Sequence, residues 1–559
     1  YFKLKFYPNF LFSTETFSAI STIEAGPKEP TSILRKAVSF DHALSETKFG
    51  KFNYFIIIVA GLILSNVLLE TLGISFVLPI SQCDLNLSTK AKGILSAIGF
   101  AGIITSSHLW GFLADTTGRR KVIRPTLFIA FFLTVLSSFS NNFWFLVILR
   151  FLNGFFVSGG SATVYAYLGE FHTTKTRSRA IMGASFIFGV GAMMLPALAW
   201  AVINQQWSFH IPVLDIVYKP WRLFIVVCGI PGLVCALCLL KIPESPKFTL
   251  SQGKQEETIK ILKNIYANNT GKSGDNYTVS IKEDTNDVAA RPKASMNKSN
   301  PIVSLFRSMW DQTAPLFMKE YLRKTVLACI IQFGIFATSN GMYMWFPGIL
   351  NEMVEFMNQN PGNKTTICEV VYSNARRIQD MEAAGNLTSK LTCSETLEIS
   401  TYQHSLSLEI MYALGFAVIG FIINAVGKLP ILFAILVGCG ACGVAAIMVD
   451  IPIVAIYLYV VLLLCGLGVT VVNATTVDLY PTHLRAMAVC ISLMMGRLGS
   501  VVGANFVGLI LDTSCEAAFL SSGISLIICG FLGFLIPSPP KSSQKPVSRR
   551  TSIISMTGN

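Results

Sequence analysis

Residues 111–121 read Gly-Phe-Leu-Ala-Asp-Thr-Thr-Gly-Arg-Arg-Lys, and residues 420–428 repeat the pattern as Gly-Phe-Ile-Ile-Asn-Ala-Val-Gly-Lys. Both stretches stand between two apolar segments of helix length. A second motif also occurs in each half, an acidic residue followed at the same spacing by an arginine: Glu170 and Arg177, then Asp478 and Arg485. The repetition predicts a duplicated membrane protein with the same polar hinges in both halves, an arrangement typical of secondary transporters.

The composition also indicates a membrane protein. Of the 559 residues, 52% are hydrophobic and 13% are charged, whereas soluble proteins average about 25% charged residues. A membrane-spanning helix needs roughly 20 apolar residues. Twelve such runs occur, at residues 53–80, 91–114, 122–140, 143–168, 179–204, 221–241, 322–349, 405–426, 428–449, 451–475, 486–512 and 516–537. We expect an all-α integral membrane protein with 12 transmembrane helices in two pseudo-symmetric six-helix bundles.

The net charge of +13 follows the same topology. Lysine and arginine gather in alternate loops: after the second span at 119–124, after the fourth at 175–179, in the loop at 242–320 and in the tail from 541. The positive-inside rule places these loops, and both termini, in the cytosol. Membrane topology therefore accounts for the charge, and we expect no nucleic-acid partner.

We divide the chain into five regions. They are a cytosolic arm at 1–50, a bundle at 51–241, a cytosolic linker at 242–320, a second bundle at 321–540 and a cytosolic tail at 541–559. The linker predicts two amphipathic helices on either side of a flexible stretch at 270–298. Their apolar residues recur at helical spacing: Ile259, Leu262, Ile265 and Tyr266, then Ile302, Leu305, Phe306, Met309 and Trp310.

The long outward loop at 351–404 carries two glycosylation sequons, at Asn363 and Asn386. It also holds Cys368 and Cys393, which we expect to form a disulfide on the oxidising side of the membrane. Nine of the 13 cysteines lie in apolar spans, where a free cysteine behaves as a small hydrophobic residue.

No pattern in the sequence predicts an enzyme. Gly271-Lys272-Ser273 resembles the end of a phosphate-binding loop, but Tyr266 stands where that loop needs its first glycine. The Cys-x-x-Cys pairs at 235–238 and 439–442 lie within apolar spans, and the six histidines show no metal-binding spacing. We expect neither a cofactor nor a bound metal.

The repeated hinges predict a gate at the cytosolic side. Asp115 is followed by Gly118, which a tight turn requires, and by Arg119. The acid can face a helix N-terminus or an arginine of the opposite bundle. The competing interpretation, a solvated loop of topology-setting charges, leaves the repeated acid and glycine unexplained. The other residues expected in the gate are Arg150, Glu170, Arg177, Glu244, Asp478 and Arg485.

Two charged residues lie deeper in the spans. Glu70 stands about 24 Å along the first span, and Arg497 about 17 Å along the eleventh, at a rise of 1.5 Å per residue. Ionisable groups at such depth are costly and mark a pathway or a site. We expect Glu70 to sense substrate or proton with Arg497 nearby. The alternatives are that Glu70 reaches water at the helix end and that Arg497 pins helices together.

Neutral polar residues in spans seven and ten are further candidates for the solute pathway. Amides and aromatic side chains bind polar organic solutes, and they also satisfy helix packing. These candidates are Gln332, Asn340, Tyr343 and Trp345, then Asn473, Thr475 and Thr476.

Several of these stretches resemble known families. Residues 111–121 resemble the signature loop of the major facilitator superfamily, and Pro-Glu-Ser-Pro-Lys-Phe at 243–248 resembles its sugar-porter and organic-ion-transporter branches. Other stretches resemble the synaptic vesicle glycoprotein 2 family and its invertebrate relatives. They are Phe-Gly-Lys-Phe-Asn at 49–53, Ala-Trp at 199–200, Trp-Ser-Phe at 207–209, Trp-Phe-Pro at 345–347 and Asp-Leu-Tyr-Pro at 478–481.

The resemblance implies that Glu70, Trp200 and Asn473 line the solute site. It is incomplete there, because Val67 and Thr476 stand where that family has aspartates and Val472 stands where it has a tryptophan. A cation-binding or proton-coupled site is therefore left open by the resemblance.

Two functions follow from the sequence. The first is a transporter that moves a small organic solute by alternating access, either coupled to a proton or uncoupled. The second is a vesicle membrane protein that keeps the fold as a regulatory or trafficking scaffold. Retention of the gating pairs favours the first, and loss of deep carboxylates favours the second. We expect a lipid-embedded monomer in the plasma membrane or an intracellular vesicle.

Overall fold

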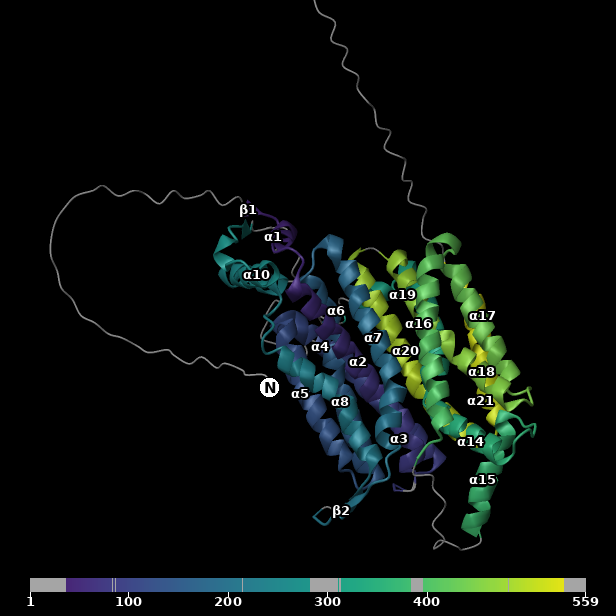
Figure 1. Cartoon of the computed structure of the whole chain (residues 1–559). Helices are drawn as coiled ribbons and strands as arrows, with labels where there is room; N and C mark the ends of the chain where they lie inside the picture. The colour runs from purple at the N-terminus through teal and green to yellow at the C-terminus, as the bar shows by residue number, and fades with distance from the viewer. Residues whose placement is uncertain are drawn as a thin grey trace, which may run out of the picture.

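The computed structural model describes residues 37–82, 84–85, 87–213, 215–281, 310, 313–383, 396–480 and 482–536. Within these ranges, 12 helical segments are long and apolar enough to cross a membrane. Six lie between residues 51 and 238 and six between 319 and 533, which confirms the expected all-α architecture. The two bundles stand side by side, the first drawn in purple to teal and the second in green to yellow (Figure 1).

The N-terminal bundle has six spans built from seven helices. These are α2 (Lys51–Leu72) continued by α3 (Ile74–Ser81), α4 (Thr89–Thr117), α5 (Arg119–Ser138), α6 (Phe143–Glu170), α7 (Thr174–Ile203) and α8 (Pro220–Cys238). The hydroxyl of Ser88 and the amide oxygen of Asn142 cap the first turns of α4 and α6. A short hairpin of β2 (Phe209–Ile211) and β3 (Ile216–Tyr218) connects α7 to α8.

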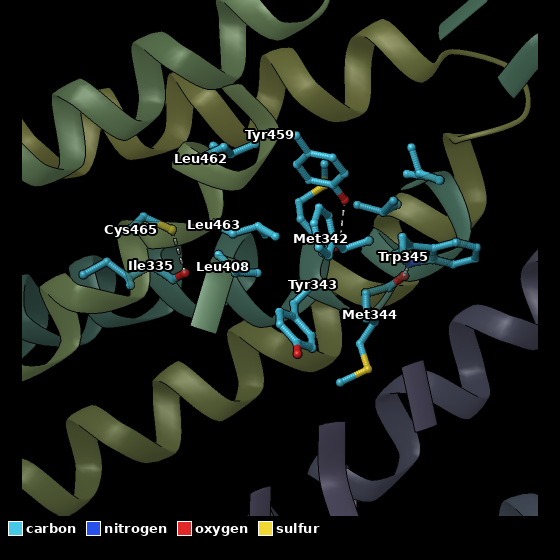
Figure 2. Packing of buried hydrophobic residues seen from close by; sticks show 14 of the residues in the cluster. Ile335, Met342, Tyr343, Met344, Trp345, Leu408, Tyr459, Leu462, Leu463 and Cys465 are labelled. Carbon is cyan, nitrogen blue, oxygen red and sulfur yellow. Dashed lines mark hydrogen bonds between the residues drawn. The ribbon is translucent and has the colours of Figure 1, made fainter. Parts of the chain in front are cut away.

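The C-terminal bundle also has six spans. These are α13 (Lys319–Tyr343), α16 (Ile399–Val426), α17 (Lys428–Ala446), α18 (Pro452–Leu463) continued through η3 (Leu464–Leu467) into α19 (Gly468–Leu479), α20 (Thr482–Ile510) and α21 (Cys515–Gly533). Figure 2 shows part of its core, where Tyr459 donates its hydroxyl to the carbonyl oxygen of Met342 at 2.9 Å.

The repeated glycines of the two signature stretches have the same structural role. Gly118 ends α4 with φ 117°, and Gly427 ends α16 with φ 93°. Each glycine is followed at once by the next helix, so the chain reverses in a single residue that a side chain would strain. The duplication read from the sequence is therefore present in the fold.

The seventh span is shorter than expected. The sequence predicted one helix over 322–349, but α13 ends at Tyr343 and a new helix, α14 (Phe346–Gln359), begins after Trp345. The outward loop predicted at 351–404 is largely helical, since α14 is followed by α15 (Ile367–Ala383). The predicted disulfide is wrong, because Cys368 on α15 is bonded to Cys515 at the start of α21. Cys393 lies outside the described residues.

Helices α10 and α15 lie at opposite ends of the bundles, which we name the linker end and the loop end (Figure 1). The bundles contact each other through α4 and α20, α7 and α16, and α3 and α14. At the start of α4, Gly93 approaches Gly508 of α20 so closely that a Cβ on Gly508 would lie 3.1 Å from the Gly93 Cα. The ring of Phe76 on α3 stacks on the ring of Tyr402 on α16, with 6.2 Å between the ring centroids. Close contact between the halves is therefore found at the loop end.

The linker forms a small folded unit with the end of the N-terminal arm. Helices α9 (Pro246–Ser251) and α10 (Gln255–Thr270) follow α8, and α1 (Phe40–Glu46) packs on α10. The strand β1 (Ala37–Val38) pairs in parallel with β4 (Ser280–Ile281). Of the predicted apolar face of α10, Leu262 and Ile265 are buried and Ile259 and Tyr266 are half-buried, while Ile261, which was not part of the prediction, is buried as well. Residues 302–309 of the predicted second helix lie outside the described residues.

Two polar side chains attach this unit to the N-terminal bundle. Asn269 at the end of α10 accepts a hydrogen bond from the Phe52 amide at 3.0 Å and so caps the start of α2. Asp41 of α1 accepts hydrogen bonds from the amide and the hydroxyl of Thr174, both at 3.0 Å, at the start of α7. The polar arm predicted at 1–50 is thus docked from residue 37 onward.

Candidate functional site

A buried ion pair lies inside the N-terminal bundle. Glu70 on α2 is 4% exposed, and its Oε2 lies 3.2 Å from Nη1 of Arg150 on α6. Thr134 on α5 donates its hydroxyl to Oε1 of Glu70 at 2.6 Å, and Asn153 donates to the Thr134 hydroxyl at 2.8 Å. Helices α5 and α6 thus supply a connected polar network to the carboxylate on α2, which offsets the cost of holding a charge at this depth.

Two of the expected positions are corrected by this pair. Arg150 was expected in the gate, but it lies beside Glu70. Arg497, expected near Glu70, lies on α20 and donates to the Ser107 hydroxyl of α4 at 2.7 Å. Ser107 in turn lies 3.0 Å from the hydroxyl of Ser158. Arg497 therefore bridges the two bundles, a contact that spacing along one chain does not specify.

The C-terminal bundle holds a second buried acid that the sequence analysis missed. Glu409 on α16 is 8% exposed and accepts a hydrogen bond at 3.0 Å from the hydroxyl of Tyr343 on α13. The predicted span began at 405, which put Glu409 near the membrane surface. Because α16 begins at Ile399, Glu409 stands about 15 Å along the helix. The signal in the sequence was that Glu409 is a single carboxylate within an otherwise apolar run, which is the same signal that singled out Glu70.

The neutral candidates divide into two groups. Gln332 of α13 donates to the Asn473 side chain of α19 at 3.4 Å, and Oε1 of Gln332 has no hydrogen-bond partner among the described residues. Asn340 donates to the Ser500 hydroxyl at 3.1 Å. Both amides therefore pair with a residue of another helix, and Gln332 is fully buried.

The remaining candidates have local roles. Trp345 is buried and donates its indole N–H to the carbonyl oxygen of Ala504 at 3.1 Å, so it fastens the break between α13 and α14 to α20. Thr476 bonds the carbonyl oxygen of Val472 in its own helix. Trp200 on α7 is 51% exposed.

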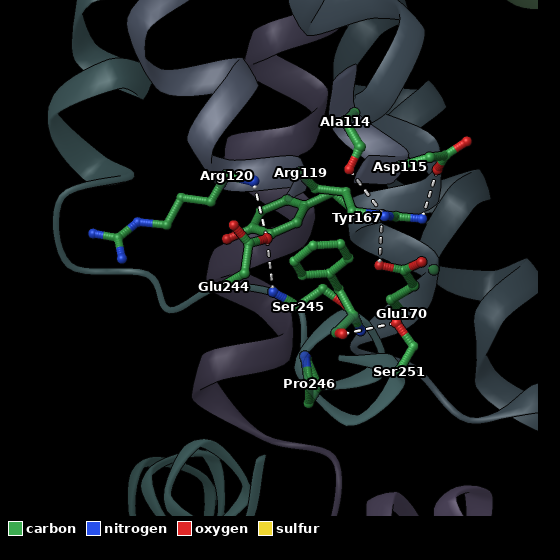
Figure 3. A network of polar contacts seen from close by, with 12 residues as sticks. Ala114, Asp115, Arg119, Arg120, Tyr167, Glu170, Glu244, Ser245, Pro246 and Ser251 are labelled. Atoms are coloured by element: carbon green, nitrogen blue, oxygen red, sulfur yellow. Dashed lines mark hydrogen bonds and ion pairs between the residues drawn. The ribbon is translucent and has the colours of Figure 1, made fainter. Parts of the chain in front are cut away.

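The predicted gate forms a network at the linker end, shown in Figure 3. Arg119 at the start of α5 lies 2.8 Å from Asp115 of α4 and 3.2 Å from Glu170 of α6. Its guanidinium also lies over the ring of Phe248, 5.2 Å from the centroid. One arginine therefore holds the ends of three helices to the segment that follows α8.

Glu244 binds the start of α5 from the opposite side. Its carboxylate accepts hydrogen bonds from the amides of Arg120 and Ser245, both at 3.0 Å. A carboxylate at a helix N-terminus is favoured because it satisfies free amides and faces the positive end of the helix dipole. Gly118 makes this approach possible, since a Cβ there would lie 2.6 Å from Oε2 of Glu244.

Two details of the predicted gate change. Glu170 pairs with Arg119 rather than with Arg177, whose Nε donates to the carbonyl oxygen of Gly169 at 3.1 Å. All of these contacts lie within the N-terminal half, so Asp115 does not reach an arginine of the opposite bundle in the described part of the chain. The side chains of Asp478 and Arg485 lie outside the described residues.

The other predicted sites are placed as follows. In the described ranges, no group of three or more His, Cys, Asp or Glu residues is arranged to hold a metal ion. Asn363 is exposed in the turn between α14 and α15. Asn386 lies outside the described residues, and glycosylation at both positions stays a prediction.

The two six-span bundles with their buried polar networks define the fold of a membrane transporter. The profile of the Major Facilitator Superfamily matches residues 52–357 and 397–556, and the chain belongs to that family.

Curated relatives agree with this assignment. The chain is 27% identical over 325 residues to synaptic vesicle glycoprotein 2B of Mus musculus, covering 56% of this chain and 47% of that protein. It is also 27% identical over 334 residues to synaptic vesicle glycoprotein 2A of Rattus norvegicus, covering 57% and 44%. The chain thus matches about half the length of these relatives.

Among solved structures, the xylose transporter XylE of E. coli in a partially occluded inward open conformation has the same fold. The TM-score is 0.57 at 14% identity, over 89% of this chain and all of that one. At this identity the likeness concerns the fold alone.

Proposed function

We propose that this protein moves a small polar organic solute across a membrane by alternating access. The observation that carries the proposal is the buried pair of Glu70 and Arg150, supported by Thr134 and Asn153. A scaffold has no need of an ion pair inside the membrane, where each charge is expensive to desolvate. Membership of the Major Facilitator Superfamily supports the same function.

The solute site lies between the two bundles in this proposal. Glu70 and Arg150 stand in the first bundle, while Gln332 and Asn473 stand in the second. Oε1 of Gln332 is buried and has no partner among the described residues, so it would accept a hydrogen bond from a solute hydroxyl or amino group once the surrounding helices move apart. A charged pair in one bundle and neutral amides in the other both offer hydrogen-bond donors and acceptors, which suits a polar solute that carries hydroxyl groups.

The conformation described here is proposed to be open toward the linker end. Gly93 meets Gly508, and Phe76 stacks on Tyr402, at the loop end. At the linker end, Arg119 and its partners bind helices of one bundle to each other. The clustered basic residues there support a cytosolic position for this end.

Proton coupling is proposed to act through Glu70. A proton on its carboxylate would remove the charge that holds Arg150, and it would free the guanidinium to turn toward the solute. Glu409 and Tyr343 offer a second proton-accepting position in the other bundle. The pair in the N-terminal bundle therefore couples the protonation state to helix positions.

A second candidate is a vesicle protein that does not transport. The similarity to synaptic vesicle glycoproteins 2A and 2B favours a vesicle location. The departures at Val67 and Val472 from the solute site that the resemblance implies favour a protein that does not transport. The retained network around Glu70 favours transport.

Uptake by the purified protein in liposomes distinguishes the two. Monosaccharides, nucleosides, organic cations and organic anions would be tested with and without an imposed proton gradient. We expect saturable uptake of one class above empty liposomes, and faster uptake with the gradient. If the folded protein moves no member of the panel faster than empty liposomes, the scaffold function is the correct one.

A further inference from the structure

A cavity of about 430 Å³ opens at the linker end between the first turns of α5 and one face of α10. Arg120, Lys121 and Arg124 form its α5 side, while Lys260 and Asn264 form its α10 side. None of the proposed transport steps uses it. It lies where α5 enters the membrane-spanning bundle, beside the gate but outside the network of Arg119.

Helical spacing gathers the cations in this cavity. Arg120 and Arg124 are four residues apart on α5, and Lys260 and Asn264 are four residues apart on α10, so each pair lies on one helix face. Arg120 is fixed in place, because its guanidinium donates to the carbonyl oxygens of Leu239 and Leu240 at the end of α8, at 2.8 and 2.9 Å.

The two acids at the cavity wall, Glu244 and Glu257, offset only part of the charge of its four cations. The carboxylate of Glu244 is already bound to the amides that begin α5. The carboxylate of Glu257 lies 3.4 Å from Lys254, which is outside the cavity wall. In the part of the chain that the structure describes, no ion pair involves Lys121, Arg124 or Lys260. Excess positive charge is left facing the cavity.

We propose that this cavity binds a phosphorylated inositol headgroup. Guanidinium and ammonium groups complement phosphate oxygens, and a ring with several phosphates can contact α5 and α10 at once. Basic pockets where spans meet a membrane surface suit anionic headgroups. A nucleotide fits less well, since no aromatic side chain among the described residues lines the cavity to stack a base. The inference does not depend on which solute is carried.

Binding would link the linker unit to the gate. The ligand would bridge Lys260 of α10 and Arg124 of α5, and Glu244 in the same wall caps the helix that carries Arg119. An occupied cavity therefore stabilises the arrangement in which α10 lies against α5.

The test measures binding to the purified full chain in detergent at about 0.15 M salt, where weak surface attraction is screened. The probes are a short-chain phosphatidylinositol bisphosphate, soluble inositol trisphosphate and short-chain phosphatidylcholine. We expect saturable binding of a phosphorylated inositol probe that Arg124→Gln and Lys260→Gln each weaken by about tenfold. The matched control is Lys175→Gln, an exposed lysine in the first turn of α7 that is not part of the cavity.

Comparison of the three probes identifies the source of the headgroup. Binding that is stronger for the lipid probe assigns the site to a membrane lipid, and equal or stronger binding of inositol trisphosphate assigns it to a soluble inositol phosphate. Glu257→Gln removes an acid from the wall and is expected to tighten binding, which keeps the proposal testable if Arg124→Gln fails to fold. Phosphatidylcholine binding as tightly, or Lys175→Gln weakening binding as much as Arg124→Gln, overturns the proposal.

Discussion

Two acids lie deep in this protein, and their partners differ. Glu70 is one half of an ion pair with Arg150, whereas Glu409 accepts a hydrogen bond from Tyr343. Removing one partner of a buried pair leaves the other charge unpaired, which is more costly than removing both. The pair in the N-terminal bundle is therefore the position where single and double substitutions report most directly on charge.

Glu70→Gln is expected to lower the free energy of unfolding by about 3 kcal/mol, because Arg150 loses its counter-charge in the interior. The double variant Glu70→Gln, Arg150→Met is expected to recover most of that loss. Thermal unfolding of the purified protein in detergent measures both. Losses that simply add in the double variant would show that the two side chains do not interact.

Gly118→Ala is expected to be destabilising by about 1–3 kcal/mol, because it combines a positive φ with the displacement of Glu244. Gly427→Ala is the matched control, since Gly427 also has a positive φ, of 93°, but a Cβ there would lie 3.9 Å from its nearest neighbour, Pro430. The difference between their melting temperatures isolates the clash with Glu244. Equal effects would mean that Glu244 does not hold the start of α5.

The sequence predicted which residues matter here better than it predicted how they pair. Depth along a span singled out Glu70, and repetition singled out Gly118. The position of Arg150 early in its span predicts a gate residue, and the seven-residue spacing predicts a pair of Glu170 with Arg177, but in the fold Arg150 pairs with Glu70 and Glu170 with Arg119. Contacts between helices depend on rotation and tilt, which the apolar pattern of a span leaves undetermined.

At the scale of elements, the sequence predicted the 12 spans and the first linker helix, since both rest on apolar length and periodicity. It did not predict that the seventh span ends at Tyr343, because the apolar run continues through α14. The wrong disulfide has a similar origin. Cys368 and Cys393 share a loop, but the fold brings α15 to the start of α21 and so brings Cys368 to Cys515.

Peptide mapping without reduction tests this disulfide. We expect a peptide that contains Cys368 to be joined to one that contains Cys515, and the link to persist in the Cys393→Ser variant. Reduction is expected to lower the stability of the loop end, since the bond closes a long segment of chain, an effect of about 2–5 kcal/mol. A Cys368–Cys393 peptide would contradict the arrangement of α15 and α21.

The exposed turn that holds Asn363 makes a second prediction at this scale. If the loop end faces the lumen or the outside, Asn363 is expected to carry a glycan. Treatment with an N-glycosidase should then speed migration on a gel, and Asn363→Gln should reduce the shift. If the N-glycosidase changes the migration of neither the wild type nor the Asn363→Gln, Asn386→Gln double variant, the loop end carries no glycan and the prediction is wrong.

At the scale of the whole molecule, two similar halves meet closely at the loop end. Gly93 and Gly508 allow helices α4 and α20 to approach there, and Arg497 bridges the same helices further along. Alternating access requires these helices to separate so that the loop end opens. A covalent link between them is therefore expected to stop transport without unfolding either bundle.

The most direct test is uptake by a Gly93→Cys, Asn505→Cys variant in liposomes, with the solute that the uptake panel identifies. A Cβ on Gly93 of α4 would lie 3.6 Å from the Cα of Asn505 on α20 without a clash. Oxidation should join α4 to α20 and abolish uptake, and reduction should restore it, while each single-cysteine variant keeps its rate under both treatments. Uptake by the crosslinked protein at the rate of the reduced protein would contradict alternating access through separation of the two halves.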